Sequence, residues 1–234
     1  MSIFAIGDLH LPGRDNKEMD IFGAHWERHF EIIENAWRER IDEGDIVLIP
    51  GDISWAMHLK DAMEDLEAIA RLPGRKILIR GNHDYWWSAV GKVRAALAED
   101  MYVLQNDSLK MDGYVFCGTR GWNFPTESTP LEGKEEKIYL REVERLKISL
   151  ESAKKQEGTL LAMMHFPPLF ADGVETVFSA MLEEAGVTDV VYGHLHGVGI
   201  KNGYEGIRNG VKYHLVSCDA IGFIPKEIIG EKYN

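Results

Sequence analysis

The residues best suited to chemistry lie in five short polar clusters spread along the chain. Each cluster follows an apolar run that is typical of a buried strand, and the carboxyl ends of parallel strands meet along one edge of a sheet. The clusters offer imidazole, carboxylate and amide groups, which suit Mn²⁺, Fe or Zn²⁺ and leave the identity of the metal open. We therefore predict a two-metal site with ligands from Gly7-Asp8-Leu9-His10, Gly51-Asp52, Gly81-Asn82-His83-Asp84, His165 and Gly193-His194-Leu195-His196.

Local spacing supports convergence within two of these clusters. In an extended segment, residues two apart point to the same side, so Asp8 should lie beside His10 and His194 beside His196. If both members of the second pair face the site, they must serve different ions. A two-metal centre also needs a bridging carboxylate, and Asp52, at the end of the second predicted strand, is the candidate.

The elements that must position these clusters alternate along the first third of the chain. Apolar residues recur every three or four positions over 26–41 and 59–70, as expected of amphipathic helices. The alternation of strand and helix predicts right-handed crossovers and a largely parallel sheet. Short runs rich in Ile, Val and Leu, which we predict to be buried strands, cover residues 3–7, 46–50, 77–80, 160–164 and 187–192.

Two later regions have the pattern of strand meanders. The first covers 102–104, 109–111 and 114–117, with turns predicted at Asn106-Asp107 and Asp112-Gly113, and a long charged helix should follow over 135–155. The second covers 198–201, 204–207 and 211–217, with turns predicted at Asn202-Gly203 and Asn209-Gly210. The second meander predicts a further sheet. Two facing mixed sheets with helices outside form a four-layer α/β/β/α sandwich, the fold class that we predict.

Composition limits the classes of function. We expect one domain over 1–234, because 45% hydrophobic residues supply a large core. The net charge of −12, with no dense block of Lys or Arg, argues against long nucleic acid as a partner. The two cysteines, Cys117 and Cys218, are predicted to be buried free thiols, which suit a reducing cytoplasm. No signal-sequence pattern and no run of the roughly 18 apolar residues that span a membrane is found, so we expect a cytoplasmic protein without a membrane partner. Surface aromatics would permit a homo-oligomer.

The order and content of the five clusters resemble the calcineurin-like metallophosphoesterase superfamily, which has the same four-layer fold. A lone histidine beside a strand usually has its hydrogen bonds satisfied and plays only a structural role. We expect this of His25, His29, His58 and His214. The joint occurrence of all five clusters in the family's order is far more specific. The resemblance implies one metal shell of Asp8, His10 and His196, a second of Asn82, His165 and His194, and Asp52 shared between them.

The resemblance also implies roles around the metals. His83 carries no metal in the family scheme and would protonate the leaving group, a task that suits an imidazole with a pKa near neutrality. Asp84 would hold His83 in orientation and stay charged. Arg80 resembles an arginine that grips phosphate in some branches of the family.

Aromatic residues near the ligand-bearing loops are candidates for a substrate cleft, with ordinary packing as the alternative. We single out Trp55 and Trp122 as substrate-binding candidates among Trp55, Tyr85, Trp86, Trp87, Trp122 and Phe124. Trp86 and Trp87 open a predicted helix, and at least one of them is expected to be exposed or to face the cleft. Residues 120–137 form either a mobile flap over the cleft or a long surface connection.

These observations favour a binuclear metal-dependent phosphohydrolase. It would cleave a small phosphomonoester or phosphodiester by attack of a metal-bridged hydroxide on phosphorus. A protein phosphatase, a lipid-linked nucleotide hydrolase and a nuclease fit the surrounding sequence less well. The alternative from another class is a non-catalytic metal-binding scaffold that binds a protein partner, against which the complete ligand set and the intact His83 argue.

Overall fold

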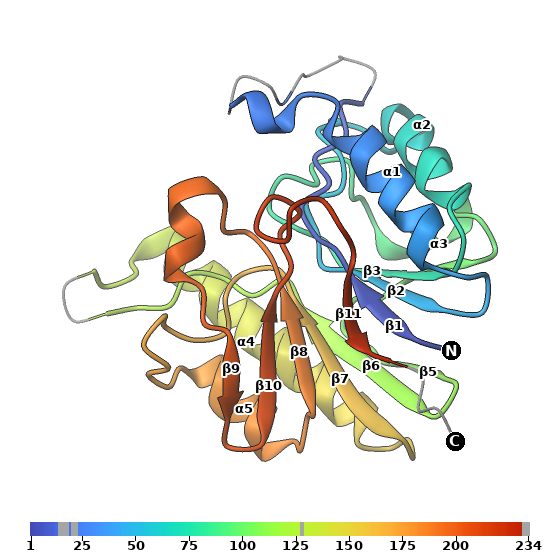
Figure 1. Ribbon diagram of the computed structural model, residues 1–234. Helices are drawn as coiled ribbons and strands as arrows, with labels where there is room; N and C mark the ends of the chain where they lie inside the picture. The colour runs from blue at the N-terminus through green and yellow to red at the C-terminus, as the bar shows by residue number, and fades with distance from the viewer. Residues whose placement is uncertain (14–18, 20–22, 127–128, 231–234) are drawn as a thin grey trace.

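Two β-sheets face each other in the computed structural model, which describes residues 1–13, 19, 23–126 and 129–230 (Figure 1). The first sheet has the strand order β11-β1-β2-β3-β4 and the second has the order β5-β6-β7-β8-β10-β9. The strands are β1 Ile3–Ala5, β2 Ile46–Ile49, β3 Arg75–Leu78, β4 Met101–Val103, β5 Leu109–Met111, β6 Tyr114–Thr119, β7 Thr159–Met164, β8 Asp189–Tyr192, β9 Gly206–Arg208, β10 Val211–Leu215 and β11 Lys226–Ile229.

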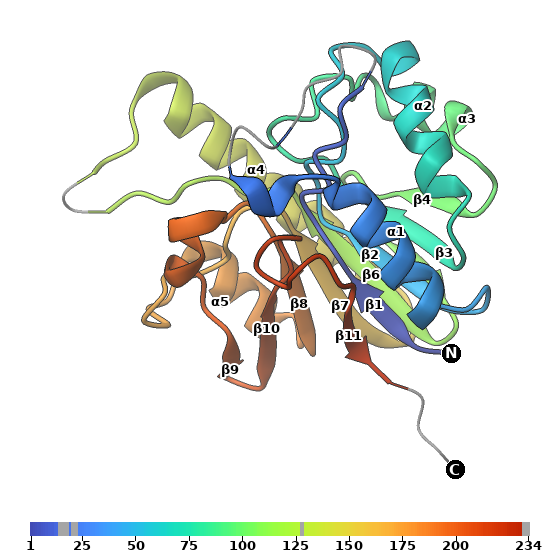
Figure 2. The ribbon, with the colours of Figure 1, turned by 45° about the horizontal axis from the view of Figure 1, so that its top comes forward.

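Helices cover the outer face of each sheet, which gives the predicted four-layer α/β/β/α sandwich (Figure 2). Residues of α1, α2 and α3 pack on the first sheet, and residues of α4 and α5 pack on the second. The helices are α1 His29–Arg40, α2 Leu59–Ala70, α3 Val90–Ala96, α4 Gly133–Ala153 and α5 Val177–Glu184, with 3-10 helices η2 Ala24–Trp26 and η3 Gly197–Asn202. None of the helices in the described residues has the length and apolar character to cross a membrane.

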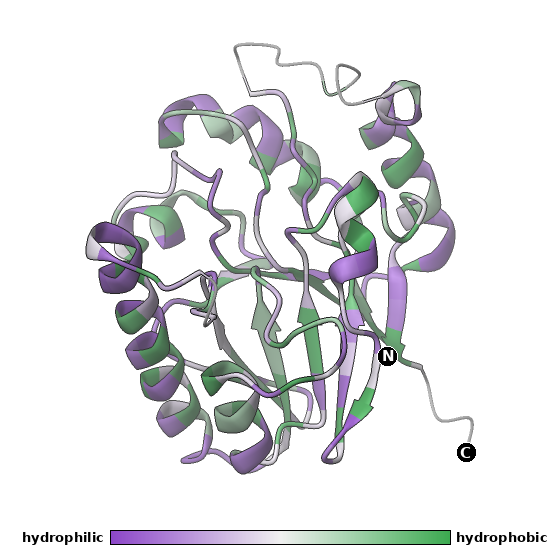
Figure 3. Cartoon of the chain, turned by 90° about the vertical axis from the view of Figure 1, so that its left-hand side faces the viewer, coloured by the Kyte–Doolittle hydropathy of each residue, from purple (hydrophilic) through white to green (hydrophobic). Residues whose placement is uncertain are grey.

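The apolar runs of the sequence are continuous because both faces of each sheet are buried. Along β2, Ile46 and Leu48 pack between the sheets, whereas Val47 and Ile49 pack under the helices. The second sheet alternates in the same way. In Figure 3 the helices carry both hydrophobic and hydrophilic residues, as expected of elements with one buried face.

Strand direction brings the polar clusters to one edge of the sandwich. Strands β1 to β4 run parallel to one another, and β6, β7, β8 and β10 do the same in the second sheet. The two sheets are joined at this edge, where Gly7 bridges to Ser217 and the Gly7 N–H donates to the Val216 carbonyl at 2.7 Å. Segments that follow strands of both sheets therefore meet at one place.

The first predicted meander is wrong, because its strands belong to different sheets. Strand β4 pairs with β3 in the first sheet, where Met101 and Val103 are buried in the core under the helices. Strands β5 and β6 form a hairpin in the second sheet. The predicted turn at Asp112-Gly113 is confirmed, with φ of 50° and 83°, whereas Asn106-Asp107 lies in the crossing from one sheet to the other.

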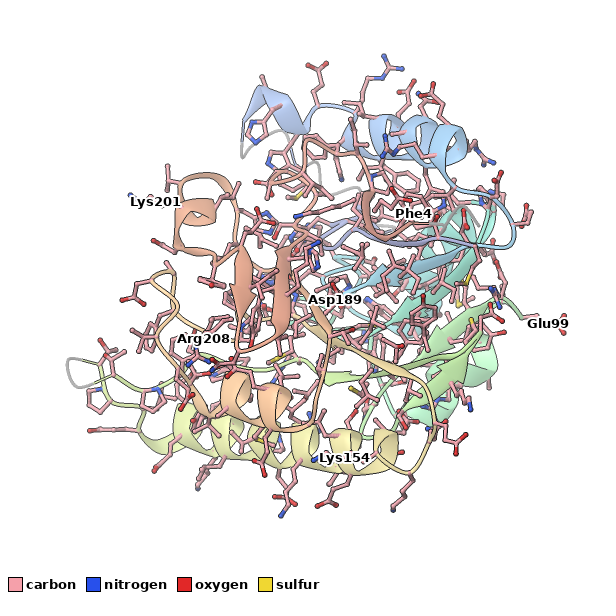
Figure 4. The ribbon with its side chains drawn as sticks, turned by 60° about the horizontal axis from the view of Figure 1, so that its bottom comes forward. Phe4, Glu99, Lys154, Asp189, Lys201 and Arg208 are labelled. Atoms are coloured by element: carbon pink, nitrogen blue, oxygen red, sulfur yellow. The ribbon has the colours of Figure 1, made fainter. Side chains whose placement is uncertain are left out.

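The second predicted meander is confirmed only in its later part. Residues 198–201 lie in the 3-10 helix η3 rather than in a strand, and Val198 is 88% exposed, so burial does not favour a strand there. The Asn209-Gly210 turn joins β9 to β10 as predicted, with φ of 47° and 84°. Arg208, labelled in Figure 4, ties this hairpin to α5 through an ion pair with Glu183 and to the segment before α5 through one with Glu175.

Candidate metal centre

Seven predicted ligand residues converge at the edge where the two sheets join. One potential ligand atom from each of Asp8, His10 and His196 lies within 4.8 Å of the others, and the same holds for Asp8, Asp52 and His165. Asp8, His10, Asp52 and Asn82 follow strands of the first sheet, and the three histidines at 165, 194 and 196 follow strands of the second. The candidate centre therefore spans both sheets.

The first group consists of two imidazoles facing a carboxylate. His10 Nε2 lies 3.3 Å from His196 Nε2, and His196 Nε2 lies 3.4 Å from Asp8 Oδ1. Asp8 is completely buried, and His10 is only 3% exposed. This is the arrangement that the resemblance implies for one metal shell.

The second group is arranged around the side chain of Asn82. Its Oδ1 atom lies 2.7 Å from His165 Nε2 and 3.0 Å from His194 Nδ1. Asp52 lies between the two groups, with Oδ2 at 3.4 Å from His165 Nε2 and 3.9 Å from His10 Nε2. The position of Asp52 suits the predicted bridging carboxylate, although Asp8 also approaches both groups.

We predicted that extended backbone would bring Asp8 beside His10 and His194 beside His196. The structure shows a different backbone conformation in both clusters. Asp8, His10, Asp52 and His194 have φ of 58°, 45°, 51° and 73°, in the left-handed region, which is uncommon for residues other than glycine although Asp and His adopt it more often than most. Such conformations cost on the order of 1–3 kcal/mol each and persist where surrounding structure holds them. Here the Asp8 N–H donates to the Gly51 carbonyl at 2.9 Å and the His10 N–H to the Asp52 carbonyl at 3.0 Å.

Two glycines allow the turns to approach the carboxylates closely. A methyl group added to Gly81 would overlap Asp52 Oδ1, and one added to Gly193 would overlap Asp8 Oδ2. The N–H of His194, the next residue, donates to both oxygens of Asp8 at 3.0 and 3.1 Å. The backbone of one sheet thus orients a carboxylate of the other.

Asp84 organises backbone rather than the His83 ring. Its completely buried carboxylate accepts the N–H groups of Asp52, Ile53, Ser54 and Gly81 at 2.8–3.2 Å, and the indole N–H of Trp86 at 3.0 Å. No hydrogen bond joins it to the His83 ring among the described residues, and His83 Nδ1 is buried without a partner. The expectation that Asp84 holds His83 in orientation is therefore replaced by a different role, fixing the loops that carry Asp52 and Asn82.

Asp219 belongs to the site and was missed by the sequence reasoning. Its Oδ1 lies 2.8 Å from His196 Nδ1, and its Oδ2 accepts the Gly197 N–H at 2.9 Å. It follows β10 in Ser217-Cys218-Asp219, the same strand-then-acid pattern as the other clusters, but without the glycine or histidine that drew attention to them. A carboxylate on one ring nitrogen of a histidine fixes the other nitrogen for a metal.

Burial is a main cause of the pKa shifts in the site. It lowers the pKa of His10 and of His194 to about 3, so both imidazoles are neutral at pH 7 and can act as ligands. Burial also raises the pKa of Asp52 to about 7, helped by the charges of Asp84 and Asp8. At His196 the carboxylates of Asp219 and Asp8 outweigh burial and raise the pKa to about 10. For Asp8, the histidines around it outweigh burial and lower its pKa.

These donors fit a pair of metal ions. His10 Nε2 and His196 Nε2 lie 3.3 Å apart, and either the proton that His196 holds in the metal-free site or a cation can lie between them. The surrounding donors are the mixed nitrogen and oxygen set that Mn²⁺, Fe and Zn²⁺ accept, and the two free cysteines are not among the clustered ligands. Both cysteines are buried, as predicted.

A cavity of about 290 Å³ opens beside these ligands, and it contains only some of the predicted substrate contacts. Trp55 lines it, stacked on His10 at 4.9 Å between ring centroids and 4.6 Å from His83. Trp122 does not line it and packs instead on Phe166 at 4.9 Å. The cavity is lined by His10, Met19, His25, Trp26, Asp52, Trp55, His83, His194, His196 and Gly197.

Three further expectations concern Trp86 and Trp87, Arg80, and the segment 120–137. Trp86 and Trp87 are 1% and 4% exposed and both pack in the core under the helices, so the expectation that one is exposed or faces the cleft is wrong. Arg80 lines a different cavity, described below. The proposed flap segment over 120–137 includes residues 127 and 128, which lie outside the described residues, and α4 begins within it at Gly133.

Residues 1–198 match the family model for the calcineurin-like phosphoesterases. The chain belongs to this family. Among solved structures, it is similar to the protein of unknown function AQ665 from Aquifex aeolicus, with 14% identity, a TM-score of 0.49, and coverage of 97% of this chain and 95% of that one. It is also similar to TT1561 of Thermus thermophilus, with 13% identity, a TM-score of 0.53, and coverage of 83% and 81%.

At 13% identity, the likeness to TT1561 supports the shared fold alone. No curated protein matches the chain. The family assignment and the clustered donors together identify a metallophosphoesterase-type site, and its substrate has to be argued from the geometry.

Proposed function

We propose that this protein hydrolyses a small phosphomonoester or phosphodiester at a two-metal centre. The observation that carries the proposal is the position of Asp8 and Asp52 between two histidine groups, at the wall of a cavity that also contains His83. Two metal ions in such a centre neutralise the oxygens of a phosphoester and make the attacking water more acidic.

The predicted ligands would form two metal shells with one shared carboxylate. Asp8, His10 and His196 would hold one ion, Asn82, His165 and His194 the other, and Asp52 would contact both. The backbone N–H of His83 donates to Asp52 Oδ1 at 2.8 Å, which leaves Asp52 Oδ2 toward the histidines. Asp219 would keep His196 Nε2 directed at the centre.

His83 is the proposed proton donor to the leaving oxygen. Its ring lies in the cavity wall between Trp55 and Tyr85, and its Nδ1 atom has no partner among the described residues. Burial and the nearby His165 lower the pKa of His83, whereas the negative charge of a bound phosphoester favours the protonated ring. A phosphoester therefore supplies both the hydrogen-bond partner and the charge that His83 lacks.

The cavity walls favour a substrate with an apolar or aromatic part. Trp26, Trp55 and Met19 line the cavity, and the Trp26 ring lies 5.6 Å from the His196 ring. Flat rings of this kind stack on a base or an aryl group at about 1–3 kcal/mol per ring. The proposed substrate is thus a small phosphoester with such a group, and Trp55 is the residue proposed to contact it.

Hydrolysis of p-nitrophenyl phosphate and bis-p-nitrophenyl phosphate tests the proposal. The Mn²⁺-loaded protein should cleave at least one of them, and Asp52→Asn with the same purification should not. Preference for the diester would direct the search to diesters such as cyclic nucleotides, and preference for the monoester to phosphatase substrates. Failure to cleave either ester above the variant, with Mn²⁺, Fe or Zn²⁺ bound, would overturn the proposal in favour of a metal-binding scaffold.

A further inference from the structure

A second cavity, of about 210 Å³, lies beside the metal centre and shares none of its lining residues with the first. The segments after β3 and β4, the end of β6 and helix α4 contribute to it. Its polar walls come mainly from Arg80, Arg120, Arg145, Glu142, Gln105 and Asn106. The proposed reaction uses none of these side chains except Arg80, whose assignment rests on family resemblance.

The charges in this second cavity do not balance. Completely buried Glu142 accepts hydrogen bonds from Arg120 at 3.1 Å, Arg145 at 2.8 Å and the Thr119 hydroxyl at 2.7 Å. No ion pair of Arg80 is found within the part of the chain that the structure describes. The lining therefore contains three guanidinium groups and one carboxylate, which leaves an excess of positive charge in a partly enclosed space.

Hydrogen-bonding capacity is also unused. The Nε atoms of Arg80 and Arg120 are both buried, and neither has a hydrogen-bond partner in the described part of the chain. A buried donor without a partner costs about 1–3 kcal/mol, and more when it is charged. Burial, together with the charges of Arg80 and Arg145, lowers the pKa of Arg120 in spite of Glu142. An acceptor with negative charge would relieve both deficits.

The cavity is connected to the metal centre through backbone. Arg80 stands two residues before Asn82, and the Arg120 carbonyl accepts the N–H groups of His165 at 3.0 Å and Phe166 at 2.9 Å. The Arg120 guanidinium also lies over the Trp122 ring, 4.5 Å from its centroid. A ligand held by these arginines would thus contact the segment that carries Asn82 and the residue whose carbonyl accepts the His165 N–H.

We propose that this second cavity is a binding site for a small oxyanion, such as a phosphate or carboxylate group. Guanidinium groups are planar donors that match such oxyanions in geometry as well as charge. Gln105, Asn106 and Ser88, which also line the cavity, add neutral polar groups. The oxyanion is either a free ion or a second acidic group of the substrate, and the two sources share this chemistry.

Phosphate binding to the Mn²⁺-loaded chain tests the proposal by equilibrium dialysis with radiolabelled inorganic phosphate. We expect two sites per chain, one at the metal centre and one in the second cavity. Arg145→Gln and, separately, Arg80→Gln should weaken one site at least about tenfold, as expected for loss of a charged hydrogen bond. Lys147→Gln, which removes an exposed charge from the same helix, is the matched control and should keep both sites.

The variants also separate the possible outcomes. Arg80→Gln breaks no ion pair that the structure shows, so it remains informative if Arg145→Gln is unstable. A single phosphate site in the wild type that both arginine variants leave unchanged would overturn the proposal. The Asp52→Asn chain should keep the second-cavity site even if no ester is hydrolysed, so failure of the proposed function and failure of this inference are distinguishable.

A kinetic comparison distinguishes the two sources of the oxyanion. If the substrate supplies it, Arg145→Gln should raise KM about tenfold for adenosine 3′,5′-bisphosphate but not for adenosine 5′-monophosphate. If KM is unchanged for both nucleotides while phosphate binding is weakened, the site holds a free anion. Either result supports an oxyanion site, provided that the dialysis experiment shows it.

Discussion

At the scale of single residues, Asp219 is the side chain whose importance the geometry shows most directly. A carboxylate 2.8 Å from His196 Nδ1 fixes the tautomer and the direction of Nε2, and loss of such a partner typically lowers metal affinity 10- to 100-fold. We expect that decrease in Mn²⁺ affinity, measured by calorimetry, for Asp219→Ala. Asp189→Ala removes a similar partner from His214, away from the site, and is the control. Equal affinities for the two variants would contradict the positioning role.

The protonation of the metal-free site gives a second prediction at this scale. His196, with its pKa at about 10, is protonated in the metal-free chain at pH 7, and Asp52, with its pKa at about 7, is about half protonated. A metal must displace those protons, so metal binding should weaken as the pH falls through 7. Calorimetry in buffers with different ionisation enthalpies should show release of about one or more protons per chain at pH 7. A heat of binding that is independent of the buffer would exclude this coupling.

The ligand residues could be predicted from sequence, whereas their conformations and supporting partners could not. Residue type and position after an apolar run were enough to predict Asp8, Asp52 and His165 as neighbours. The left-handed backbone of Asp8 and His194 depends on hydrogen bonds from distant segments, which no local pattern contains. The role of Asp84 could not be predicted for the same reason, because its five hydrogen-bond partners are backbone and indole groups and not the neighbouring His83 ring.

At the scale of elements, the turn after β8 must bring backbone against Asp8. Gly193→Ala should disrupt the centre, since a methyl group there would overlap the Asp8 carboxylate. We expect at least about a tenfold loss of Mn²⁺ affinity, by analogy with the loss of an orienting contact, while the far-UV circular dichroism is retained. Gly199→Ala, which meets open space in η3, is the matched control. Unchanged metal binding in Gly193→Ala would show that the turn can move away.

Element prediction succeeded where apolar residues are buried in a sheet and failed at an exposed segment. Strands β2, β7 and β8 were found because both of their faces are buried, which gives continuous Ile, Val and Leu. The segment at 198–201 has an apolar composition but forms η3, since exposed Val198 has no sheet to join. Helix α5 was missed because its capping box uses Thr176 and Ser179 instead of an acidic residue, so the usual start signal is weak.

At the scale of the whole molecule, the candidate centre is a link between the two sheets. The first sheet carries Asp8, His10, Asp52 and Asn82, and the second carries His165, His194 and His196, so bound metals would join the halves of the sandwich. A ligand that binds only the folded chain stabilises it by about 2.7 kcal/mol at 100 times its Kd. Thermal unfolding with Mn²⁺ at that excess should therefore give a higher Tm than unfolding with a chelator.

The same sheets are also joined without metal, through the Gly7–Ser217 bridge and the core between them. The metal-free chain should consequently keep its far-UV circular dichroism at 25 °C and lose only part of its thermal stability. In Asp52→Asn the rise of Tm with Mn²⁺ should be smaller than in the wild type, because the carboxylate between the two groups is lost. Equal Tm values with Mn²⁺ and with chelator in the wild type would mean that the centre does not link the sheets energetically.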